Sequence, residues 1–156
     1  MASNITRGHD GERFYARVFQ SLGFPKCKTS RLGSRLMDNC KVDLMNIPYN
    51  IQIKAGTHKG LKAYTILNEM VELLKNNFET SDPVQNHPKF LIHRRMIYSK
   101  SADNDLIYFL QEDYEHFVNK GFYADCIVRP IHSKKHLQGL LYITTFGELK
   151  KYLTNK

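Results

Sequence analysis

The sequence contains no tryptophan, few cysteines and no long apolar run. Its three cysteines, Cys27, Cys40 and Cys126, form no CxxC pair and have no histidine at metal-ligand spacing, which argues against a structural zinc site and against a disulfide framework. Because such cysteines are typical of a reducing compartment, we expect a cytoplasmic protein, in the host cytoplasm if a phage encodes it. No apolar stretch approaches the roughly 18 residues that span a bilayer, so we expect no membrane partner.

The composition indicates one globular domain with a surplus of positive charge. Of the 156 residues, 42% are hydrophobic and 24% are charged, which is typical of a globular protein, and this length suits a single domain over residues 1–156. The formal net charge is +8. A balance this basic favours a polyanionic partner, most often nucleic acid, although a Lys-rich surface without such a partner gives the same count.

Hydrophobic periodicity predicts a mixture of helices and strands. Phe14, Val18 and Leu22 recur every fourth residue and predict a helix over residues 10–22, and a second apolar stripe predicts a long helix over residues 61–78. Residues 31–39 and 82–88 are expected to be loops. Further strands are expected over residues 27–30, 89–98, 105–110 and 140–143, and further helices over residues 112–118 and 146–153.

The segment KVDLMNIPYNIQIKAG, residues 41–56, carries the strongest local pattern. Apolar residues mark one strand over residues 42–47, a proline-containing turn follows at 48–50, and Ile51 and Ile53 alternate with Gln52 and Lys54 in a second strand. We therefore expect a β-hairpin here. With the flanking helices, the pattern predicts an α/β fold with a mixed central sheet.

Three polar residues of this hairpin form a candidate catalytic cluster. Gln52 and Lys54 share one face of their strand because side chains two residues apart point the same way, and the hairpin brings Asp43 roughly level with them. Asp43 and the Gln52 carbonyl can bind a hard divalent ion, and Lys54 can orient a water or stabilise negative charge. Glu12, from the first helix, can add a carboxylate to the metal or act through a water. A half-solvated hairpin without a function shows the same alternation.

These segments resemble the PD-(D/E)XK nuclease superfamily, particularly the archaeal-type and phage-type Holliday-junction resolvases and the Mrr-type endonuclease domains. GHDGERFYARVFQSLGF is similar to the resolvase opening, DNCKVDL to the motif with the central acid, and IQIKAG to the (D/E)XK strand. The resemblance implies a restriction-endonuclease-like core and a Mg²⁺- or Mn²⁺-dependent endonuclease that needs no small-molecule cofactor. It implies catalytic roles for Asp43, Gln52, Lys54 and Glu12, with Asp43, Gln52 and Glu12 as metal ligands.

The chain departs from the family pattern at two points. Lys41 and Val42 stand where a proline is usual before the acid, and Gln52 stands where an acid is usual. A Q-x-K version is familiar in Mrr-type members, but it removes one negative charge, so ion affinity should be weaker and Glu12 more important. Branched DNA is the leading substrate, and double-stranded DNA cut by a restriction-type enzyme is the second. The alternative from another class is a non-catalytic DNA-binding protein on a decayed nuclease fold.

The resemblance also implies DNA contacts and a dimer. Resolving a branched junction needs two cuts, so a chain with one site is expected to form a homodimer, with the C-terminal half as the expected donor of the surface. Arg and Ser side chains suit phosphate oxygens, as does a helix N-terminus, although solvated basic segments look the same. Six residues are expected to contact DNA: Ser30, Arg31, Ser34, Arg35, Lys59 and Lys62.

Overall fold

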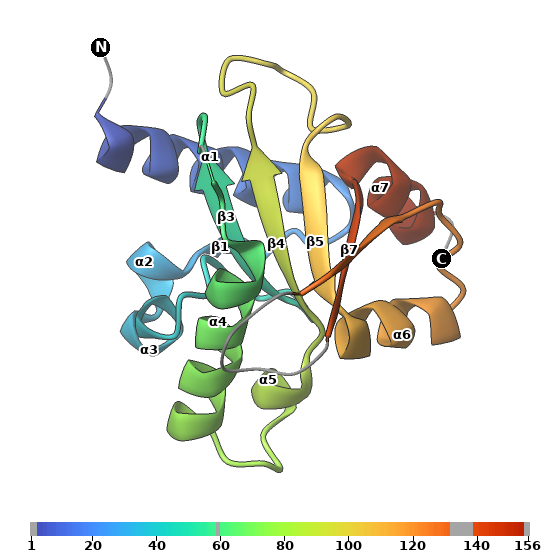
Figure 1. Ribbon diagram of the computed structural model, residues 1–156. Helices are drawn as coiled ribbons and strands as arrows, with labels where there is room; N and C mark the ends of the chain where they lie inside the picture. Colours follow the sequence, from blue (N-terminus) through green and yellow to red (C-terminus); the bar gives the residue numbers. More distant parts are fainter. Residues whose placement is uncertain (1–2, 59, 132–138, 155–156) are drawn as a thin grey trace.

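The computed structural model describes residues 3–58, 60–131 and 139–154 and places a five-stranded mixed sheet between helices on its two faces (Figure 1). The predicted α/β class with a mixed central sheet is thus confirmed. The helices are α1 (Asn4–Ser21), α2 (Ser30–Gly33), α3 (Arg35–Asn39), α4 (Ala63–Asn77), α5 (Pro83–Asn86), α6 (Gln111–Asn119) and α7 (Phe146–Thr154). The strands are β1 (Lys28–Thr29), β2 (Leu44–Met45), β3 (Asn50–Ala55), β4 (Lys89–Arg94), β5 (Leu106–Leu110), β6 (Ile127–Pro130) and β7 (Leu140–Thr145).

The order of strands in the main sheet is β3-β4-β5-β7-β6, while β1 and β2 form a separate antiparallel pair. Strands β3 and β4 run parallel, and every other neighbouring pair in the main sheet is antiparallel. Two parallel neighbours need a crossover connection, which α4 provides. The parallel register places Gln52 opposite Leu91 and Lys54 opposite His93.

The two faces of the sheet bury separate apolar clusters. Behind the sheet in Figure 1, α1, α6 and α7 cover one face, where Ile51, Phe90 and Phe109 are fully buried. In front of it, α4 covers Leu91 on the other face. Because side chains alternate along a strand, Gln52 lies on the α4 side, as does Lys54. Among the described residues, no helix is both long enough and apolar enough to cross a membrane.

The predicted hairpin over residues 42–54 is wrong. Strand β2 pairs with β1 instead, and the ladder partner of β3 is β4. Asn46 adopts a left-handed φ of 66°, a conformation that asparagine tolerates, and this ends β2 after Met45. One backbone hydrogen bond, from the Asp43 N–H to the Ile51 carbonyl at 2.8 Å, still joins the two segments.

The short polar segments differ most from their predicted structure. Residues 31–39 lie in α2 and α3 rather than in a loop, and the Ser34 hydroxyl caps α3 by accepting the Met37 N–H at 3.2 Å. Residues 82–88 contain α5, which the Asp82 carboxylate caps at the Val84 N–H. Strand β4 ends at Arg94, short of the predicted residue 98, and β6 was not predicted. Helix α1 begins at residue 4 rather than 10.

A buried ion pair ties α1 to the sheet. Arg94 ends β4 with 2% of its side chain exposed, and its guanidinium lies 3.0 Å from the carboxylate of Asp105. Tyr15 on α1 donates its hydroxyl to the same carboxylate, and burial together with that carboxylate raises the pKa of Tyr15, so the phenol keeps its proton. The guanidinium also lies 3.6 Å from the centre of the Phe14 ring. Arg94 and Asp105 thus fasten one helix and two strands together.

Replacing Arg94 should destabilise the fold strongly. In Arg94→Ala the Asp105 carboxylate stays buried without its cation, so we expect a loss of about 3–5 kcal/mol in the free energy of unfolding. Urea denaturation measures it. The neighbouring Arg95 is exposed, and Arg95→Ala should change the same quantity by less than about 0.5 kcal/mol. Equal losses in the two variants would contradict a structural role for the ion pair.

Candidate active site

Helix α1 lies unusually close to β3 at Gly11. A Cβ added to Gly11 would lie 3.1 Å from the Cβ of Ala55 and 3.6 Å from Cγ2 of Ile53. The absence of a side chain therefore allows the helix to approach the strand. Glu12 follows directly and lines the same cleft as Asp43, which reaches it from the segment before β2. The contact at Gly11 thus brings the two carboxylates together.

Hydrogen bonds from two elements fix Asp43. Besides the backbone bond to Ile51, its carbonyl accepts the Ser30 N–H at 2.9 Å, and Oδ2 of its carboxylate accepts the Ile53 N–H at 2.7 Å. In a continuous sheet a backbone carbonyl of a neighbouring strand would accept the Ile53 N–H. Here the Asp43 carboxylate accepts it instead. The side chain is held against β3 beside Gln52 and Lys54, which is the grouping that the sequence predicted.

The charge of Glu12 disfavours the ionised form of Asp43. Burial, followed by the charge of Glu12, raises the pKa of Asp43 to about 8, although the Ile53 N–H and Lys54 act in the opposite direction. Burial also raises the pKa of Glu12, while Arg31, 3.3 Å away, opposes this effect. A divalent cation between the two carboxylates would favour the ionised form of both.

The surrounding cleft has a volume of about 660 Å³ and is lined by α1, by Lys41 and Asp43, and by residues 52–58. Gln52 is 8% exposed, and its Oε1 is buried without a hydrogen-bond partner among the described residues. A buried oxygen left unpaired costs about 1–3 kcal/mol, so it suits a position where a ligand supplies the missing contact. His9 and His58 line the cleft as well.

The residues present fit a hard divalent ion. Two carboxylates and one unpartnered amide oxygen are the kind of oxygen donors that Mg²⁺ and Mn²⁺ bind. In the part of the chain that the structure describes, no three His, Cys, Asp or Glu side chains group closely enough to hold a metal. The side-chain oxygen donors that line this cleft together are those of Glu12, Asp43 and Gln52.

The residues predicted to contact DNA have different positions. Ser30 is fully buried and donates its hydroxyl to the Val42 carbonyl, so it supports Asp43 from inside the protein instead of facing DNA. Arg31 pairs with Glu12, and Ser34 caps α3. Arg35 and Lys62 are exposed. Lys59 lies outside the described residues.

Sequence reasoning missed two cleft residues on α1, Arg7 and His9. His9 precedes Glu12 by three residues, which places both on one helix face. That spacing was the available signal. The sequence predicts the start of this helix at residue 10, whereas α1 begins at Asn4, so Arg7 and His9 lie on helical turns that the apolar periodicity does not mark.

Comparison of the chain with models of protein families, with curated proteins and with solved structures found no match. The residues of the cleft and their geometry are therefore what indicates a function.

The raised pKa of Asp43 predicts a pH-dependent stability. In the unfolded chain this carboxyl titrates near its ordinary value of 3.8, so between that pH and about 8 the folded state holds the extra proton. The stability of the metal-free protein should therefore fall as the pH rises through this range. In Asp43→Asn the contribution of this group disappears, because the amide does not ionise.

Thermal unfolding of both proteins in EDTA between pH 5 and pH 9 measures the difference. The variant should gain in relative melting temperature as the pH rises, whereas Asp125→Asn, which changes an exposed aspartate, should follow the unmodified protein. Parallel pH profiles for Asp43→Asn and the unmodified protein would show that Asp43 is not held in its protonated form.

Proposed function

We propose that the chain is a Mg²⁺- or Mn²⁺-dependent endodeoxyribonuclease with a restriction-endonuclease-like core of the PD-(D/E)XK type. One observation carries the proposal: Glu12, Asp43 and the unpartnered Oε1 of Gln52 converge on one cleft that Lys54 also lines. These are the four residues to which the family resemblance gave catalytic roles. The mixed sheet with its parallel β3–β4 pair is compatible with such a core.

Each residue has a distinct task in phosphodiester hydrolysis. A bound divalent ion acidifies a water and neutralises charge on the phosphate. Asp43, held by the Ile53 N–H, and Gln52 supply oxygen ligands from adjacent segments, and Glu12 closes the site from α1. The amine of Lys54 orients the attacking water and stabilises negative charge as it develops on the phosphoryl oxygens. Arg31 pairs with Glu12 at the side of the cleft and can exchange that partner for a phosphate.

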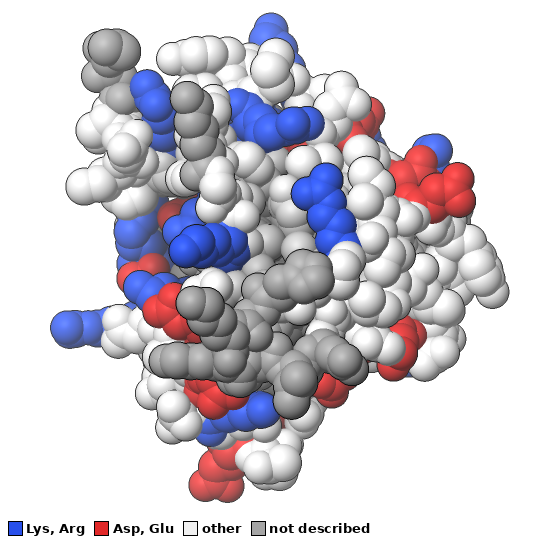
Figure 2. Space-filling model, viewed as in Figure 1, with Lys and Arg blue, Asp and Glu red and all other residues white. Residues whose placement is uncertain are grey.

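Charge supports DNA as the substrate. Figure 2 shows Lys and Arg side chains over the upper and left-hand parts of the visible face, where α1, β3 and the segment after β4 lie in Figure 1, with some acidic side chains among them. With a net charge of +8, the surface attracts a phosphate backbone. The proposed substrates are branched, Holliday-junction-like DNA and double-stranded DNA.

Cleavage by matched variants tests the proposal. Asp43→Asn should lower the cleavage rate at least about 100-fold, because it removes a charged metal ligand. DNA affinity should change less than about threefold, because binding depends mainly on Lys and Arg. Asp125→Asn, purified in the same way, should cleave like the unmodified protein and so controls for contaminating nucleases. The substrates are a four-way junction and a linear duplex, each with Mg²⁺, Mn²⁺ or EDTA.

Cleavage in EDTA, or equal rates for the two variants, would contradict the proposed metal site. DNA binding without cleavage under any of these conditions would favour the non-catalytic DNA-binding protein instead.

We propose further that the enzyme acts as a homodimer, since two cuts need two sites. Strand β6 lies at the edge of the sheet in the C-terminal half, with Ile127 59% and Val128 47% exposed. An edge strand that pairs with no further strand among the described residues and carries apolar side chains offers a surface for pairing with a second copy.

A charge on this edge should separate the subunits. Val128→Arg buries an unpaired cation in the proposed dimer surface, so we expect a monomer by sedimentation velocity at micromolar concentration where the unmodified protein is a dimer. Leu32→Arg changes a residue that is 77% exposed on α2 and should leave the dimer intact. A monomeric unmodified protein, with or without DNA, would contradict junction resolution and leave a single-cut nuclease.

A further inference from the structure

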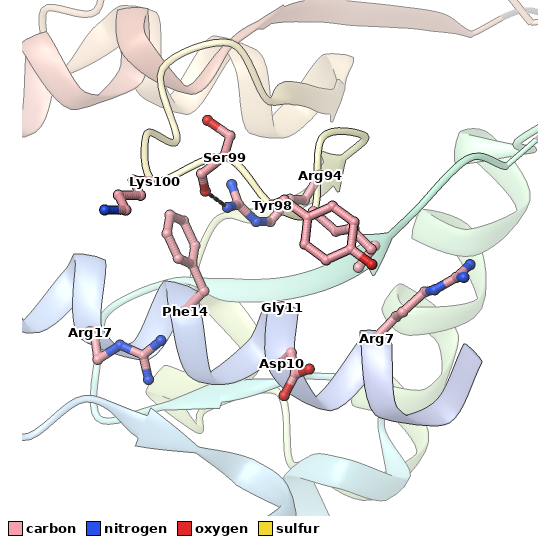
Figure 3. A pocket seen from close by; sticks show the side chains of 11 residues that line it. Arg7, Asp10, Gly11, Phe14, Arg17, Arg94, Tyr98, Ser99 and Lys100 are labelled. Atoms are coloured by element: carbon pink, nitrogen blue, oxygen red, sulfur yellow. Dashed lines mark hydrogen bonds between the residues drawn. The ribbon is translucent and has the colours of Figure 1, made fainter. Parts of the chain in front are cut away.

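A second cavity, of about 440 Å³, lies on the other flank of α1, between the helix and the segment that follows β4 (Figure 3). Figure 3 shows Phe14 pointing from α1 toward the segment after β4, which carries Tyr98 and Lys100. Arg7 and Arg17 line the cavity from α1, one on either side of Phe14 along the helix. The mechanism proposed above uses none of these five residues.

The lining of this cavity is complementary to an anion. Arg7, Arg17 and Lys100 make no ion pair within the described part of the chain, and the Nε of Arg7 is buried without a hydrogen-bond partner. The acidic residue of the lining, Asp10, is already paired with Arg13 at 2.5 Å. The net charge offered to a ligand is therefore positive.

The same cavity offers aromatic ring faces. Tyr98 is 88% exposed, so its ring packs against little of the protein. Phe14 lies deeper, with the Arg94 guanidinium over its ring. Aromatic rings beside unpaired Arg and Lys side chains are the combination that binds a nucleotide. Bases stack on aromatic rings and guanidinium planes, and phosphates pair with the cations. A base held within a duplex offers no free face, so the ligand has to be unpaired.

The cavity and the candidate active site adjoin each other. Arg7 and Ala55 line both of them. A strand whose phosphate lies in the cleft therefore reaches the cavity within the space of neighbouring nucleotides, with the half-buried Arg7 side chain between the two.

We propose that this cavity binds an unpaired nucleotide of the strand that is cut, so that the enzyme selects DNA in which single strand adjoins duplex. The inference rests on the proposed nuclease function and specifies its substrate class. Overhangs, flaps and the open centre of a branched junction all provide such a nucleotide. Tyr98 stacks on the base, and Arg17 and Lys100 contact the phosphates that flank it.

Fluorescence anisotropy in EDTA tests the binding step. The unmodified protein should bind a duplex with a short single-stranded overhang about tenfold more tightly than a blunt duplex, as expected for one stacked base. Tyr98→Ala should abolish this preference and leave blunt-duplex affinity unchanged. Tyr123→Ala is the matched control, because Tyr123 is 87% exposed and lines a different cavity. Arg17→Ala should weaken overhang binding more than Lys120→Ala, which removes another exposed cation away from this cavity.

Two further arms separate the alternatives. Free dAMP should compete only at millimolar concentration. If dAMP instead binds at micromolar concentration and changes the cleavage of blunt duplex, the cavity holds a free effector nucleotide and the proposal is overturned. An overhang preference that survives Tyr98→Ala also overturns it. Cleavage with Mg²⁺ is measured separately from binding. If the protein cuts DNA without preferring an overhang, only this inference is overturned. If it binds overhangs preferentially but cuts nothing, nucleotide binding in the cavity is supported and the proposed nuclease activity is overturned.

Discussion

Helix α1 crosses β3 at Gly11, where an added Cβ would lie 3.1 Å from the Cβ of Ala55. This close approach fixes the height of the helix above the strand, and with it the position of every side chain that α1 contributes. Glu12 faces the cleft on one flank, while Tyr15 on the other anchors the helix to the Asp105 carboxylate. Both cavities depend on the same contact, because each is a space between α1 and the end of a strand.

The cleft between α1 and β3 is electrostatically unfavourable in the absence of a ligand. Asp43 lies half-buried near Glu12 with its pKa raised to about 8, and Gln52 buries an amide oxygen that has no partner among the described residues. Each arrangement costs stability, and a well-packed apolar cluster would avoid both costs. A cation ligated by the three side chains, as proposed above, would offset both costs together. Their coincidence in one cleft is therefore better explained by a site than by the accidental meeting of three separate polar groups.

Elements with a clear apolar stripe were predictable from the sequence, and elements without one were not. The long helices were found because Phe14, Leu67 and their neighbours recur with helical spacing, although α1 begins six residues before the predicted start. Strand β6 was missed because all four of its residues are exposed, so no alternation of apolar and polar side chains marks it. The hairpin prediction was wrong for a different reason. Strand β2 ends before Asn46, and the strand that pairs with β3 is β4, which follows α4 in the sequence.

The site was predictable where residues are close in sequence or match a motif, and unpredictable where the fold alone joins them. Gln52 and Lys54 share a face because side chains two residues apart on a strand point the same way. The burial of Ser30 behind Asp43, in contrast, depends on the pairing of β1 with β2. The second cavity joins residues more than eighty positions apart, and its aromatic ring, Tyr98, lies in a segment predicted to be strand. Because β4 ends at Arg94, the chain is free to turn back over α1 and to place that ring beside the cleft. The early end of the strand is thus what gives the molecule a second surface next to its candidate catalytic centre.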